Sequence, residues 1–170
     1  DSKIRQRATQ LLPSKPPGDR EKVIQQFQPA LEMAGDATRG RKTYLERCAS
    51  CHRLGNDGNA VGPDLVSVKS GGKEKLLASI LDPNREVAPN YLNYLVETKD
   101  GESYLGLIAS ESAANVTLRQ AFGLETIILR SNIRKIQSLN QSIMPEGLEA
   151  ALSLKEIADL LEFIGSHDFP

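Results

Sequence analysis

The local pattern of the sequence changes twice along the 170 residues, and this change limits the folds open to the chain. Up to about residue 90, apolar residues recur at helical spacing between breaks of Pro, Gly and Asp. Residues 91–139 instead form short alternating runs divided by turn signals such as Lys99-Asp100-Gly101, which is typical of antiparallel strands. Helical spacing returns over 153–165. We therefore expect a mainly α fold that carries an inserted small antiparallel β domain (α+β).

The same order predicts how the chain is divided. A helix over 20–33 follows a proline-rich linker, and Pro29 is expected to kink or split that helix. The chain begins at Asp1 instead of Met, and we take it for a mature or excised fragment of something longer. The predicted parts are an N-terminal helical extension and linker over 1–32, a main helical domain over 33–90 plus 140–170, and an inserted β-sheet subdomain over 91–139.

Composition excludes several classes of protein. No run of 18 apolar residues is present, so we expect no membrane span. The formal charge of −1 argues against nucleic acid as a partner. Residues 1–47 are net positive and residues 140–170 net negative, which indicates that the terminal helices pack together, unless the two biases are unrelated solvated faces. Aromatic residues make up 5% and Trp is absent, so the core is thin and a bound aromatic cofactor could fill part of it.

The two cysteines, Cys48 and Cys51, are separated by two residues, and His52 follows directly. C-x-x-C-H is the attachment signature of c-type haem: the two thiols reach the vinyl groups along one edge of the porphyrin, and the imidazole becomes an iron ligand. A zinc site would need four ligands, but the chain has only two Cys and two His, and His167 lies 115 residues after His52. The other interpretations are a thioredoxin-like redox pair and a disulfide. The motif follows a helix end here, which is the wrong context for the thioredoxin-like pair. We expect one covalent haem c per chain.

The sixth iron ligand must come from elsewhere in the chain. Met33, Met144 and His167 are the candidates, and an open or water-bound iron is the alternative. Met33 ends a helix and is interpreted as core packing, and His167 lies three residues from the end of the chain, where fraying is expected. Met144 lies in a polar loop stiffened by Pro145 just before the last helix, so we expect His52 and Met144 to bind the metal.

These residues resemble a class I cytochrome c over most of 33–90 and 140–170. Gly40 and Tyr44 precede Cys48 as the small and aromatic residues of that family's first helix do, and Leu160 and Phe163 match the pair on its last helix that packs against them. The resemblance implies a cytochrome c fold for the helical domain.

The segment Gly62-Pro63-Asp64-Leu65 resembles the loop that follows the haem motif in that family. The resemblance implies that the Pro63 carbonyl accepts the ring N–H of His52 and that Leu65 covers the ring edge, so that both belong to the cofactor-binding set. More narrowly, the pattern is similar to the haem-binding domain at the C-termini of large planctomycete and verrucomicrobial proteins. The similar stretches are GDATRGRKTYLERCASCH, GPDL, ILDPNREVAPNY, VETKDGESYLG and SIMPEGL.

A haem held by His and Met has no open coordination position and passes single electrons. We therefore expect a monohaem electron carrier and not an enzyme, with no catalytic residues. The alternative is a haem-based sensor or a peroxidase-like protein with a displaceable sixth ligand. Arg53, Arg85 and Tyr91 are candidates for the haem propionates or plain surface and core residues.

The resemblance implies a redox partner protein or a fused dehydrogenase domain as the electron donor. Because haem is attached to C-x-x-C-H outside the bacterial cytoplasm, we expect a periplasmic or otherwise extracytoplasmic location. The role of the sheet stays open, and its balanced charge gives no indication of what would dock there.

Overall fold

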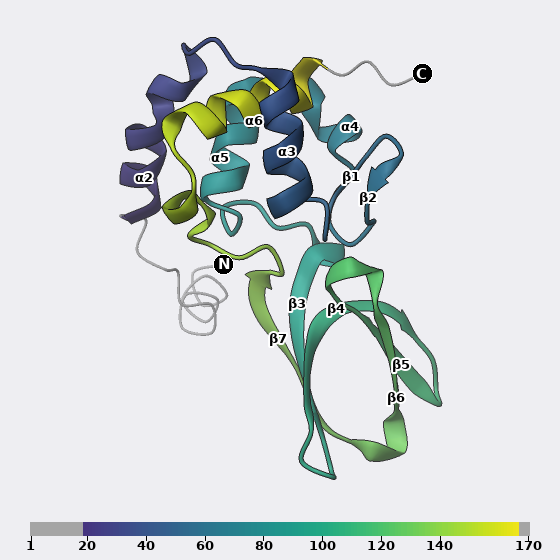
Figure 1. Cartoon of the computed structure of the whole chain (residues 1–170). Coiled ribbons are helices and arrows are strands. Elements are labelled where there is room, and N and C mark those ends of the chain that lie inside the picture. The colour runs from purple at the N-terminus through teal and green to yellow at the C-terminus, as the bar shows by residue number, and fades with distance from the viewer. Residues whose placement is uncertain (1–18, 167–170) are drawn as a thin grey trace.

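The computed structural model describes residues 19–166, in which the helices gather at one end and a curved sheet extends away from them (Figure 1). No helix in this part of the chain is long and apolar enough to cross a membrane. In chain order the helices are α2 (Asp19–Phe27), α3 (Ala37–Arg47), α4 (Leu65–Val68), α5 (Gly72–Leu81) and α6 (Leu154–Ser166), and the 3-10 turns are η1 (Gln28–Leu31), η2 (Lys69–Gly71), η3 (Pro89–Tyr91), η4 (Ala121–Gly123), η5 (Arg130–Asn132) and η6 (Leu148–Ala151).

The helix ends follow local chemistry. The prediction that Pro29 breaks the helix over 20–33 is confirmed, because α2 ends at Phe27 and Pro29 lies in the first turn of η1. Helix α3 begins after Asp36, whose carboxylate accepts a hydrogen bond from the Arg39 N–H at 3.0 Å. The predicted capping box of the last helix is also present: Glu156 accepts from the Ser153 N–H at 2.8 Å, and Ser153 Oγ accepts from the Glu156 N–H at 3.2 Å. Of the predicted extension, residues 1–18 lie outside the described residues.

Helices α3 and α6 cross at close range, and a glycine permits the approach. A Cβ added to Gly40 would lie 1.9 Å from the Asp159 carbonyl oxygen and 2.7 Å from Phe163 Cβ. One turn further on, the rings of Tyr44 and Phe163 pack with centroids 5.5 Å apart, tilted by 45°. The predicted contact of the two helices is therefore present.

The carboxylate of Asp159 joins the same two helices by charge. It is almost fully buried and accepts from the Asp36 N–H at 2.7 Å, Arg39 Nε at 2.7 Å and Lys155 Nζ at 2.6 Å. Burial alone would raise the pKa of Asp159, but the hydrogen bonds from Arg39 and Lys155 lower it to about 2.

The core of the helical end draws on every long helix. It contains Ile24 of α2, Ala30 of η1 and Tyr44 of α3 together with buried leucines of α5 and most of the apolar face of α6. Residues 19–31, which the sequence assigns to an extension, thus pack into the same core as the Cys48 helix.

The five longer strands form one antiparallel sheet in the order β6-β5-β4-β3-β7. Val96, Val116, Leu118 and Ile128 of this sheet form a second, smaller core. The strands are β3 (Leu92–Thr98), β4 (Ser103–Glu111), β5 (Asn115–Arg119), β6 (Glu125–Leu129) and β7 (Ile133–Ser142), and a separate two-residue ladder joins β1 (Arg53–Leu54) to β2 (Asp57–Gly58).

The last strand runs three residues beyond the predicted boundary at 139. Pairing of Leu92 with Ser142 extends the β3–β7 ladder, after a register shift, to the base of the Met144 loop. The sheet therefore leads directly into that loop.

Candidate haem site

The C-x-x-C-H segment forms a tight turn at the end of α3. The Cys48 N–H closes the helix on the Tyr44 carbonyl at 2.8 Å, and the Cys48 carbonyl then accepts from the N–H groups of Cys51 and His52 at 3.0 and 2.8 Å. Both thiols are free and no disulfide joins them. Burial and the neighbouring Cys51 raise the pKa of the Cys48 thiol to about 12. Two free thiols are thus placed three residues apart in this turn, directly before an imidazole.

The imidazole of His52 is fixed in orientation. Its Nδ1 lies 2.8 Å from the Pro63 carbonyl oxygen, to which it donates in the neutral form, so that Nε2 is left for a metal. Gly62 lies against the ring: an added Cβ would be 2.6 Å from Cε1 of His52. Burial lowers the pKa of His52, partly opposed by the bond to Pro63, which favours the neutral, metal-binding form.

The backbone of His52 is held from the other side by the first helix. Tyr44 Oη lies 2.8 Å from the His52 carbonyl oxygen and 2.9 Å from the Asp57 carbonyl oxygen, so one hydroxyl contacts two backbone carbonyls of the segment after α3. Burial, with the nearby Asp57 charge, raises the pKa of Tyr44 to about 12 and keeps this hydroxyl protonated. Leu65 of α4 is buried in the main core next to this loop.

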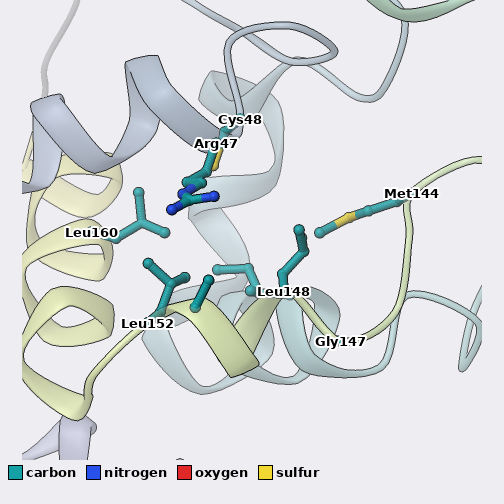
Figure 2. A pocket seen from close by; sticks show the side chains of 9 residues that line it. Arg47, Cys48, Met144, Gly147, Leu148, Leu152 and Leu160 are labelled. Atoms are coloured by element: carbon teal, nitrogen blue, oxygen red, sulfur yellow. The ribbon is translucent and has the colours of Figure 1, made fainter.

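A cavity of about 150 Å³ lies between the end of α3 and the loop after β7. Figure 2 shows Cys48 and Arg47 on one side and Met144 reaching in from the other. Apart from the Arg47 guanidinium, the side chains are apolar or carry sulfur. The lining residues are Arg47, Cys48, Ile80, Met144, Gly147, Leu148, Ala151, Leu152 and Leu160.

The structure separates the candidates for the sixth ligand. Met144 lines the cavity, whereas Met33 packs against the helical core, as predicted from the sequence. His167 lies outside the described residues. Among residues 19–166, no three His, Cys, Asp or Glu side chains gather as a metal-holding group.

These residues fit a covalently attached haem. Two free thiols stand at the spacing that the vinyl groups require, the imidazole beside them keeps one nitrogen available, and Cys48 shares an apolar cavity with a thioether. The apolar side chains of the lining suit the ring of a porphyrin better than a hydrated ion.

Several lining residues carry no signal in the sequence. Ile80, Leu148 and Leu152 are ordinary apolar residues of helices and turns, and only the folded chain brings them together. Of the suggested propionate partners, Arg53 pairs with Asp64 at 2.9 Å and Arg85 lies 3.6 Å from Glu21. Neither arginine lines the cavity, nor does Tyr91.

Comparison with known proteins gives one family match. The family model described as Cytochrome c matches residues 37–103, which run from the start of α3 to the first residue of β4. The match includes Cys48, Cys51 and His52, whereas Met144 and α6 lie beyond it. No curated protein matches the chain. The chain contains a cytochrome c-like domain, a haem-binding electron-carrier domain with covalently bound haem c.

Proposed function

We propose that this protein is a monohaem c-type cytochrome that transfers single electrons and has no catalytic residues of its own. Cys48 and Cys51 would form the thioether bonds, and His52 and Met144 would hold the iron. Pro63 would orient His52, and Leu65 would cover the ring edge. The bound haem supplies a one-electron iron couple.

One observation carries this proposal: Met144 and Cys48 line the same apolar cavity although 96 positions separate them in the chain. A sensor or peroxidase-like site would need an open position and an acid–base group beside it. The Met144 thioether in the lining supports a filled sixth position, which suits electron transfer.

The finer parts of the proposal concern origin and setting. The quoted sequence stretches support a domain of the planctomycete and verrucomicrobial type, accepting electrons from a redox partner or a fused dehydrogenase domain. Haem attachment to C-x-x-C-H supports a periplasmic or otherwise extracytoplasmic location. The two separate hydrophobic cores support an inserted sheet over 91–139 that is distinct from a haem domain over 33–90 plus 140–170, onto which residues 19–31 pack.

Replacing Met144 with Ala in the haem-loaded protein tests the ligation. The ferric iron should change from low towards high spin, lose the weak absorption band at about 695 nm that marks methionine ligation, and bind cyanide readily. The reduction potential should fall, because the soft ligand that favours ferrous iron is lost.

Met33→Ala is the matched control, since that side chain packs in the core, and it should leave spectrum and potential unchanged. If His167→Ala abolishes the low-spin state while Met144→Ala retains it, the haem has two histidine ligands and the proposal is wrong.

A further inference from the structure

The side chain of Asn84 contacts the Met144 loop two residues before and two residues after the methionine. Asn84 Oδ1 accepts from the Ser142 N–H at 2.8 Å, and Asn84 Nδ2 donates to Glu146 Oε1 at 2.5 Å. One amide thus bridges both ends of the five-residue segment 142–146. A planar amide that uses its acceptor and a donor at once sets the distance between the two ends.

The segment between these contacts has further ties of its own. The Met144 N–H donates to Ser142 Oγ at 3.1 Å, and the Ile143 N–H donates to the Tyr91 carbonyl at 3.4 Å. Pro145 removes one backbone torsion, and Gly147 takes a left-handed φ of 88° where the segment turns into η6. The bond from the Ser142 N–H to Asn84 holds Ser142 in place, and the hydroxyl of Ser142 in turn accepts the hydrogen bond from the Met144 N–H.

Asn84 is itself anchored to the helical core. It lies in the turn that follows α5, where the Arg85 N–H donates to the Asp82 carbonyl at 3.1 Å and Pro83 is buried. Leu81, the last residue of α5, is fully buried in the core that also contains Tyr44. The Asn84 amide therefore ties the Met144 loop to the same helical core that supports the Cys48 turn.

We infer that Asn84 is a positioning residue that holds the Met144 thioether at the haem iron. This inference rests on the proposed ligation by Met144. Without the two hydrogen bonds the loop has more conformations available, so the methionine spends a smaller fraction of time at the metal. An external ligand that competes with Met144 should then bind more tightly, by about tenfold, since one of the two lost bonds is made to a carboxylate.

The test is an imidazole titration of the ferric, haem-loaded protein, together with the band at about 695 nm. Asn84→Ala and Asn84→Ser should each tighten the apparent Kd for imidazole and weaken the band. Asn132→Ala is the matched control: it removes an amide bond of 2.9 Å to Asp100 within the sheet and should leave both readouts at the wild-type values.

A pair of substitutions supplies a rescue. Asn84→Asp keeps an acceptor for the Ser142 N–H but places a carboxylate against Glu146, so imidazole binding should tighten. In the double variant Asn84→Asp with Glu146→Gln, the amide at position 146 can donate to the carboxylate at position 84, so the hydrogen bond is restored in the opposite direction. The Kd for imidazole should then return towards wild type. This pair also decides the question if the Ala variant fails to fold with haem.

The outcomes separate this inference from the proposed function. If Met144→Ala abolishes the band while the Asn84 variants bind imidazole within twofold of wild type, the positioning role is wrong and the ligation stands. Lower stability of the Asn84 variants with unchanged imidazole binding likewise overturns it, because the residue is then only structural. If Met144→Ala leaves band and Kd unchanged, both proposals fail together.

Discussion

The crossing of α3 and α6 makes a sharp prediction for Gly40→Ala. The new methyl carbon would lie 1.9 Å from the Asp159 carbonyl oxygen and 2.6 Å from its carbonyl carbon, whereas ordinary contacts begin at 3.4 Å. The opposing atoms are backbone, so no side-chain rotation can relieve the overlap, and the helices must move apart.

The magnitude follows from two opposing effects. Overpacking of a tight interface costs about 3 kcal/mol at the upper end of its usual range, which applies here because the shortfall of about 1.5 Å is against backbone. Replacing a helical glycine with alanine gains about 1 kcal/mol. The free energy of unfolding should therefore fall by about 2 kcal/mol, and the urea midpoint by about 1 M for a chain of this size.

The assay is urea unfolding of the haem-loaded protein followed by circular dichroism. Gly165→Ala is the matched control, because Gly165 lies on α6 and the nearest atom to its added Cβ is Lys73 Cε at 3.9 Å. That variant should be as stable as wild type or up to about 1 kcal/mol more stable. Equal midpoints for Gly40→Ala and wild type would refute the reasoning from close contact.

Two further predictions concern buried polar groups around the same helices. Asp159→Asn should lower the free energy of unfolding by about 2 kcal/mol at neutral pH, because the carboxylate accepts bonds from Arg39 and Lys155. The folded pKa of Asp159, about 2, lies below the ordinary value of about 3.9, so this stabilisation is present above pH about 4 and is lost as the pH falls towards 2. The urea midpoints of wild type and Asp159→Asn should therefore converge over that range. A constant difference between them would contradict the prediction. Tyr44→Phe should cost about 1–2 kcal/mol in the same melts, because two part-buried carbonyls lose the hydroxyl that they share. Tyr104→Phe, which loses an exposed contact of 3.3 Å, should leave the urea midpoint at the wild-type value.

Local chemistry determined much of this protein before any tertiary contact is considered. Pro29 ends α2, the capping box of Ser153 and Glu156 starts α6, and alternation over 91–139 predicts strands, because each effect acts between residues close in sequence. The C-x-x-C-H motif belongs to the same class, since its chemistry is contained in five consecutive residues.

The tertiary structure decided what depends on residues far apart in the chain. Met144 follows Cys48 by 96 positions and enters the cavity because β7 pairs with β3 up to Ser142 and directs the loop there. Asn84, an unremarkable polar residue in a turn, contacts both ends of that loop only once α5 has packed into the core. No periodicity or spacing could predict these contacts, because a hydrogen bond between distant residues is set by where their elements pack and not by the residues around them.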